Sequence, residues 1–274
     1  MITPSQPHEF TTAARSQQFE AIAAVAEQTA ALLRSCVDTA VPIPGARWTV
    51  GEAAAHLLVA NELMAGLAEG RQLPYGDGTP ESLAEANAAS LAVFTERDGT
   101  VLADGIVRHA HAFNEAACLR PPDGPTLTPL GPMDLATLGS YLLTHMLGHG
   151  YDIAVALRRP HMIDRERLEL ALPFLTLAMP RVVDKRAAAG HNGCYELRVR
   201  GGSRFAVTFA DGVATVSAEP PRRPDCTVAA EPVTFFLLAL GRCSPTRAIA
   251  RGKILAWGRK PWRAPGFPTL FTAP

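Results

Sequence analysis

The sequence predicts a multidomain, mainly α protein in which a four-helix bundle is followed by a small α+β domain. Its 274 residues exceed one ordinary domain, and 47% of them are hydrophobic, enough for more than one core. Apolar residues recur at helical spacing in long Ala-rich stretches up to about residue 160, whereas they alternate at every second position beyond residue 190. We therefore expect a bundle over residues 1–162, a helical connector over 163–190 and the α+β domain over 191–274.

Two helices are predicted in the first seventy residues. The first spans about Glu9–Asp38 and ends at a turn rich in proline and glycine, which cannot continue a helical ladder. Thr49 is then suited to the N-cap of the second helix, because Glu52 follows three residues later and completes a capping box. This second helix should run to about residue 70.

Two more long helices complete the predicted bundle. Residues 81–118 are periodic and Ala-rich, which predicts a third helix with an interruption near Gly99. Residues 119–132 contain so many prolines that we expect an irregular loop there. Asp134 is placed to cap the fourth helix, which should end near Leu157.

The second half changes from a helical to a strand pattern. Residues 164–186 form a helical pattern that contains Pro173 and Pro180, so this helix should be kinked or split. Strands are then predicted over residues 195–200, 205–209, 213–217 and 226–230, and a last one ends near 258. Asp211 and Gly212 indicate a two-residue hairpin turn. An apolar helix should span residues 231–241, and the remaining tail should pack on the surface.

Composition and charge favour a small-molecule partner. The chain has 26 basic and 26 acidic residues and no basic block, so neither nucleic acid nor a membrane surface is an expected partner. The five cysteines are odd in number and widely spaced, which argues for reduced thiols. Residues 1–10 do not resemble a signal peptide, and no apolar run is long enough for a bilayer. We expect a cytoplasmic monomer or homodimer.

The segment with the clearest chemistry is residues 139–154, which contains His145 and His149. On a helix, this spacing places both imidazoles on one face, one turn apart, within reach of one metal ion. The pair alone is a weak motif and needs a third ligand. His56 on the second predicted helix is a candidate because bundle cores build metal sites from facing helices, although a lone histidine on an apolar face is more often structural.

These motifs also carry a family resemblance. The segment Trp48-Thr-Val-Gly-Glu-Ala-Ala-Ala-His56, followed by His145-x-x-x-His149-x-x-Asp152, resembles the DinB-like metal-binding bundles, in particular the actinobacterial mycothiol-dependent maleylpyruvate isomerase branch. The likeness covers about residues 10–160. The second half resembles the sterol-carrier-like domain that commonly follows in that branch, through Asp225-Cys-Thr-Val, the helix over 235–241 and Arg251-Gly-Lys-Ile.

The resemblance implies one divalent metal, usually zinc, held by His56, His145 and His149. It also implies a low-molecular-weight thiol, mycothiol, as cosubstrate. The isomerase has a carboxylate at the position that matches His145, whereas many DinB-like thiol transferases have histidine there, as this sequence does. The resemblance therefore implies thiol chemistry but leaves the isomerase reaction open.

The residues agree with that chemistry. Three neutral imidazoles leave an open coordination position on zinc, where an entering thiol is deprotonated and becomes nucleophilic. Asp152 could hold an imidazole N–H, or it could simply face solvent near the helix end. The arginines of the second domain that could bind a carboxylate of the thiol are Arg242, Arg247 and Arg251, although a plain surface role is more common.

Three functions remain open from the sequence. We favour a metal-dependent S-transferase in which a thiolate, from mycothiol, attacks an electrophilic small molecule. A cis-trans isomerase of the maleylpyruvate type would share that first step and differ in releasing the thiol unchanged. A non-enzymatic protein that binds an apolar ligand in the second domain is the alternative from another class. A bundle without metal would leave three structural histidines.

Overall fold

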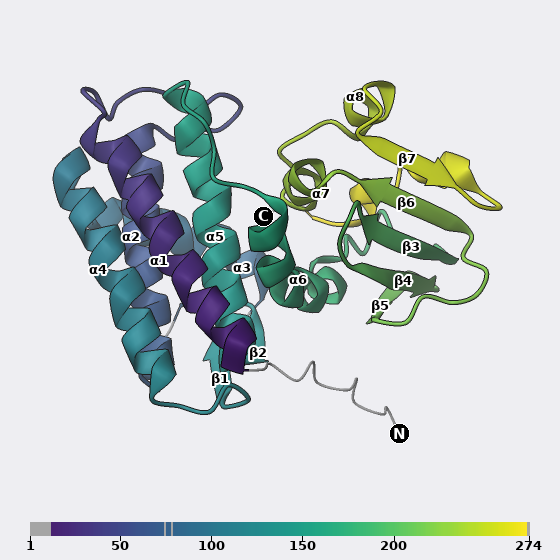
Figure 1. Ribbon diagram of the computed structural model, residues 1–274, viewed down its shortest axis with the longest axis horizontal. Coiled ribbons are helices and arrows are strands. Elements are labelled where there is room, and N and C mark those ends of the chain that lie inside the picture. Colours follow the sequence, from purple (N-terminus) through teal and green to yellow (C-terminus); the bar gives the residue numbers. More distant parts are fainter. Residues whose placement is uncertain (1–11, 74, 78, 273–274) are drawn as a thin grey trace. The chain divides into compact units, whose positions relative to one another are not determined.

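The computed structural model describes residues 12–272 except residues 74 and 78, and these form two compact units that divide between Ile163 and Asp164 (Figure 1). The predicted start of the first helix at residues 9–11, and the segment 1–10 examined for a signal peptide, lie outside the described residues. From Asp164 onward, the predicted connector groups with the second unit.

Four helices pack together in the first unit, as the periodicity predicted: α1 (Thr12–Arg34), α2 (Val50–Ala68), α4 (Gly99–Cys118) and α5 (Leu135–Ala156). Figure 1 shows them side by side and roughly parallel in axis. Every helix contributes fully buried side chains to one core, among them Ile22, Leu57, Ile106 and Leu142. This packing fixes which faces of α2 and α5 meet.

The helix predicted over residues 81–118 is divided in two. A shorter helix, α3 (Pro80–Val93), packs on α2, and the chain leaves the helical conformation at Phe94. Asp98 then caps α4, and its carboxylate accepts hydrogen bonds from the backbone N–H groups of Thr100 and Val101 at 2.8 and 2.9 Å. The interruption predicted near Gly99 is thus a five-residue break, after which α4 begins at its own N-cap.

Both predicted caps of the histidine-bearing helices are confirmed. At α2, the Thr49 hydroxyl accepts from the backbone of Glu52, and the Glu52 carboxylate accepts from the backbone of Thr49 at 2.8 Å, which is a complete capping box. At α5, the carboxylate of Asp134 accepts from the backbone of Thr137 at 2.7 Å. The caps fix where each helix begins and therefore the rotation of its side chains.

The expected irregular loop over 119–132 is wrong, because part of it is a hairpin. Strands β1 (Pro125–Thr128) and β2 (Gly131–Asp134) pair antiparallel. Each strand of a two-stranded ribbon has one unpaired edge, so a proline without an N–H can occupy it without loss of a ladder bond. Gly131 supplies the positive φ of +89° that the turn requires.

The second unit begins with α6 (Arg165–Ala178), which contains Pro173 and is followed by a 3₁₀ turn, Met179–Val182; the predicted kink or split is thus a split. A five-stranded mixed sheet follows in the order β5-β4-β3-β6-β7, in which only the β3–β6 pair is parallel. The strands are β3 (Gly193–Val199), β4 (Arg204–Ala210), β5 (Val213–Ser217), β6 (Cys226–Ala230) and β7 (Ile254–Trp257).

The turns and helices of this unit follow the sequence closely. Asp211 and Gly212 both adopt positive φ, 50° and 82°, as the predicted two-residue hairpin requires. Helices α7 (Pro232–Ala239) and α8 (Pro245–Ala250) stand between β6 and β7. The tail differs from expectation: Phe267 is only 7% exposed, and its ring lies 4.7 Å from that of Tyr195, so the tail completes a core.

None of the helices in the described part of the chain combines the length and the apolar character that a bilayer crossing requires.

Candidate metal centre

Three histidines from two facing helices meet inside the first unit. His56 lies on α2, and His145 and His149 lie one turn apart on α5. One ligand nitrogen from each ring lies within 4.8 Å of the other two. The ring centroids are 4.9 Å apart for His56 with either of the others, and 4.6 Å for His145 with His149. The predicted triad is therefore a compact cluster.

Small buried residues lie close to the histidines on both helices. Ala55 directly precedes His56 on α2, Ala53 lies one turn before it, and both are fully buried. Gly148 and Gly150, on either side of His149, are buried as well. Gly150 allows a close approach of α1, because a Cβ there would lie 3.1 Å from Thr29 Oγ1.

Burial keeps His56 neutral. Its side chain is enclosed, with 5% of the residue exposed, and desolvation lowers the pKa of His56 to about 4. At neutral pH the ring therefore has a nitrogen lone pair, which is the form that binds metal ions. The Nε2 atoms of His56 and His145 lie only 3.0 Å apart.

Asp152 lies beside the outer nitrogen of His149. Its Oδ2 is 3.6 Å from His149 Nδ1, and both side chains are 15% exposed. A carboxylate there favours the tautomer with hydrogen on Nδ1. In this tautomer Nε2, the ring nitrogen that does not face Asp152, is unprotonated. The geometry thus agrees with the predicted supporting role of Asp152, which itself stays a prediction.

The donor set fits a divalent metal of the zinc type. Two nitrogens bound to zinc at about 2.1 Å with a tetrahedral angle are about 3.4 Å apart, close to the separation of His56 Nε2 and His145 Nε2. Within the described residues, no cysteine, aspartate, glutamate or further histidine joins the group. Three imidazoles alone would leave a tetrahedral ion with one position for an external ligand.

Two aromatic side chains at the cluster were not singled out from the sequence. The indole of Trp48 stacks on His149 at 5.7 Å with an interplanar angle of 28°, and its centroid is 4.9 Å from that of His56. Tyr141, one turn before His145, lies 6.3 Å from that ring. Desolvation raises the pKa of Tyr141, so its hydroxyl stays protonated. The sequence signal for Tyr141 was its position four residues before His145, which places both rings on one face of a helix.

An open pocket of about 520 Å³ lies along the same face of α2. Val59 and Leu63 line it, three and seven residues after His56, so they continue the face that carries the histidine. Tyr75, which also lines it, contributes to the raised pKa of Tyr141 and is therefore near that side chain. The pocket has the size of a small-molecule site, and residues of α2 and α3 line it, but none of the three histidines does.

The three arginines proposed to bind the thiol all belong to the second unit. Arg242 follows α7 and donates a hydrogen bond to the backbone oxygen of Leu240 at 3.1 Å. Arg247 on α8 and Arg251 at its end are exposed. Their role toward a bound thiol stays a prediction.

The fold and the cluster define a class of protein: a helical bundle that gathers three histidines from facing helices, joined to a mixed α/β sheet domain. Residues 19–154 match the mycothiol maleylpyruvate isomerase N-terminal domain, and residues 177–258 match the SCP-2 sterol transfer family. The chain thus combines these two domains, as its motifs indicated.

Two solved structures have a similar fold over most of the chain. A crystal structure of the mycothiol-dependent maleylpyruvate isomerase aligns with a TM-score of 0.50 and 16% sequence identity, covering 88% of this chain and 92% of that one. A histidine-to-alanine mutant of that isomerase aligns with a TM-score of 0.51 and 14% identity over the same shares. No curated protein matches the sequence. At this identity the likeness concerns the fold alone.

Proposed function

We propose that the protein is a metal-dependent enzyme that uses a low-molecular-weight thiol, mycothiol, to attack an electrophilic small molecule. The observation that carries the proposal is the cluster of His56, His145 and His149, whose ligand nitrogens lie within 4.8 Å of one another. A zinc ion held by these residues would supply acidity, lowering the pKa of a thiol at the open position so that the thiolate is available at neutral pH.

The chain's own residues would bind the ion and orient the reactants. His56 is neutral because it is buried, and Asp152 favours the His149 tautomer that presents Nε2. The Trp48 indole covers one face of His149 and excludes water from that side. The electrophile would occupy the pocket along α2, where Leu63 and Leu73 offer apolar contact. Arg71, whose Nε lies 2.7 Å from Glu69 Oε2, offers its remaining N–H groups to an anionic group.

Transfer of the thiol to the electrophile is the favoured reaction. His56, His145 and His149 would hold the ion without a carboxylate ligand, so they would leave it its full charge to stabilise a thiolate. In such a transfer, a C–S bond forms at the electrophile, and the thiol proton goes to solvent or to the departing group. The adduct is then released as product.

An isomerase reaction is the second candidate. It is supported by the similar fold of a mycothiol-dependent maleylpyruvate isomerase over 88% of this chain. In that reaction, the same thiolate addition would be followed by rotation about the former double bond and loss of the unchanged thiol. A non-enzymatic role for the second unit with an apolar ligand is less favoured, because the pocket described there is lined by arginines.

Metal content tests the site directly. We expect about one equivalent of zinc or a similar ion in protein purified without chelator, and less than about a tenth of that in His149→Ala. His111→Ala is the matched control, because this exposed histidine on α4 lies outside the cluster and should leave the metal content unchanged. Less than about half an equivalent in the wild type, or equal metal in both variants, would contradict the metal centre.

The reaction itself is tested with mycothiol and a panel of electrophiles, followed by mass spectrometry. Wild type and His111→Ala should form adducts at least about 100-fold faster than His149→Ala if the metal activates the thiol. Accumulation of adduct supports transfer, whereas an isomerised substrate with mycothiol regenerated supports the isomerase. Equal rates with all three proteins would rule out metal-activated thiol chemistry.

A further inference from the structure

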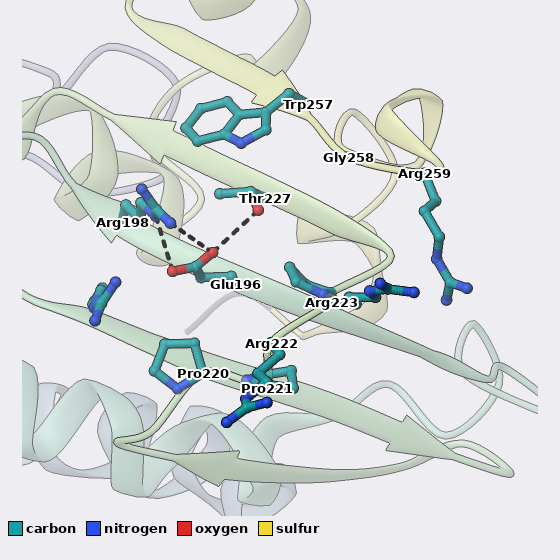
Figure 2. Close-up of a pocket in the computed structure, with 12 residues that line it drawn as sticks. Glu196, Arg198, Pro220, Pro221, Arg222, Arg223, Thr227, Trp257, Gly258 and Arg259 are labelled. Atoms are coloured by element: carbon teal, nitrogen blue, oxygen red, sulfur yellow. Dashed lines mark hydrogen bonds and ion pairs between the residues drawn. The ribbon is translucent and has the colours of Figure 1, made fainter.

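A second pocket lies on the sheet of the second unit and is unrelated to the histidines. It is an open groove of about 550 Å³, lined by strands β3, β4, β6 and β7 and by the segment 220–224 (Figure 2). We call it the arginine groove because it is lined by Arg198, Arg204, Arg222, Arg223 and Arg259. Trp257 lies on one side of it and Pro220 and Pro221 on the other.

Strand register places the lining side chains on one face. Glu196 is paired with Thr227, and Thr227 with Trp257, so the three form a row across the sheet. Arg198 and Arg204 form part of the next row, directly opposite each other. Because side chains alternate along a strand, this face is the opposite of the one on which buried Tyr195 and Leu197 contribute to the core.

A buried carboxylate fixes the floor of the groove. Glu196 is 4% exposed and accepts hydrogen bonds from Arg198 Nε and Nη2 at 2.9 and 3.0 Å, and from the Thr227 hydroxyl at 3.2 Å. The Arg198 guanidinium also lies 5.5 Å from the centre of the Trp257 ring. One wall is therefore held in place by a bidentate ion pair and an aromatic contact (Figure 2).

Three of the four remaining arginines lack protein counterions among the described residues. Arg259 pairs with Asp225 at 2.6 Å, but Arg204, Arg222 and Arg223 make no side-chain hydrogen bond or ion pair with any residue that the structure describes. Arg204 also stands directly opposite Arg198, an arrangement of like charges that destabilises a sheet. An anion bound between these side chains would relieve that repulsion.

We propose that the arginine groove binds a small polyanion that carries a planar ring, with phosphate or carboxylate groups on the arginines and the ring against Trp257. Guanidinium groups bind both kinds of oxyanion in bidentate fashion, and three without partners suit more than one negative charge. Trp257, 43% exposed, offers a face for stacking. The concave shape and volume fit a nucleotide-sized molecule better than a membrane surface or a duplex.

Calorimetric titration of the full chain tests the groove with ADP, pyrophosphate and adenosine as probes. ADP should bind most tightly, pyrophosphate more weakly and adenosine weakest. The double variant Arg222→Gln/Arg223→Gln should weaken ADP and pyrophosphate about tenfold or more. Its matched control is Lys185→Gln/Arg186→Gln, another adjacent and exposed basic pair in the same unit with the same change in charge, which should leave both affinities within about twofold.

The ring contact has its own readout. Trp257→Leu should weaken ADP severalfold but leave pyrophosphate unchanged, because only ADP has a base to stack. Equal losses of ADP affinity in the two double variants would mean that ADP is attracted unspecifically to positive charge, and would overturn the proposal. Absence of ADP and pyrophosphate binding, together with capture on vesicles of phosphatidylcholine and phosphatidylglycerol that depends on Arg222 and Arg223, would assign the face to a membrane surface instead.

Discussion

At the scale of single residues, Asp152 is predicted to determine which nitrogen of His149 faces the cluster. Replacing it with asparagine removes the negative charge 3.6 Å from His149 Nδ1 but preserves the size of the side chain. We expect Asp152→Asn to bind zinc about 10- to 100-fold more weakly while its helical circular dichroism stays unchanged. Competition with a chromophoric chelator measures the affinity. Exposed Asp123→Asn is the control, and a zinc affinity of Asp152→Asn equal to that of the wild type would show that Asp152 does not support the metal centre.

A second carboxylate couples the stability of the sheet unit to pH. Desolvation opposes the charged form of Asp225, but hydrogen bonds from the Cys194 backbone, Lys260 and Arg259 outweigh it and hold the pKa of Asp225 below its usual value. The charged form is therefore favoured in the folded state, so the stabilisation is present above about pH 4 and is lost as the pH falls through the lowered pKa.

Urea unfolding at two pH values tests this dependence. Asp225→Asn should lower the free energy of unfolding at pH 7 by about 1 kcal/mol, and the difference from wild type should shrink at pH 3. Glu219→Gln, at an exposed carboxylate of the same unit, should show no such difference at either pH. A deficit in Asp225→Asn that is the same at both pH values would contradict the charge as its cause.

Residue identity and spacing were enough to predict part of the cluster. His145 and His149 follow from helical periodicity alone, whereas His56 needed the family motif, because a single histidine on an apolar face carries no signature of its own. Trp48 was not predicted as a neighbour of His149, since it precedes the N-cap of its helix and its direction depends on how α2 packs against α5.

At the scale of elements, the capping box at Thr49 supports the helix that carries His56. Thr49→Ala removes the hydroxyl that accepts from the Glu52 backbone and should lower the free energy of unfolding by about 1 kcal/mol. Thr100→Ala in the first turn of α4 is the matched control, because its hydroxyl makes no cap and alanine favours helix. Thermal unfolding of both variants measures the difference, and a loss in the control as large as in Thr49→Ala would contradict the cap.

The break between α3 and α4 illustrates what local pattern does not contain. The Ala-rich periodicity is almost continuous there, yet the Thr39 hydroxyl bonds the backbone oxygen of Arg97 at 2.8 Å. A Cβ at Gly99 would lie 2.9 Å from the backbone oxygen of Leu33. The end of α1 therefore determines where α4 begins, and such contacts between distant segments leave no mark on helical periodicity.

At the scale of the whole molecule, the division into two compact units predicts a local effect of metal binding. A ligand at about 100 times its dissociation constant stabilises the folded state by about 2.7 kcal/mol. Removing zinc with a chelator should therefore speed amide hydrogen exchange by up to about 100-fold in α2 and α5, with little change in the strands β3 to β7. Exchange followed by mass spectrometry resolves both regions, and equal acceleration in the strands would contradict this confinement.

The order of the two units was predictable because each half has its own periodicity, helical before residue 160 and alternating after 190. The arginine groove was not predictable from the sequence, because its residues come from four strands and a loop. Only the sheet register brings Arg198 opposite Arg204. Long-range strand pairing is not encoded in spacing along the chain.

The stacking of Trp48 on His149 gives the cluster an intrinsic optical reporter. An indole 5.7 Å from a ligand ring lies within range of quenching by a paramagnetic ion, so Ni²⁺ or Cu²⁺ bound by the histidines should reduce emission from Trp48. The other two tryptophans, Trp257 and Trp262, are exposed in the second unit and should emit at longer wavelength. The blue part of the emission spectrum would thus follow occupancy of the metal centre without any label.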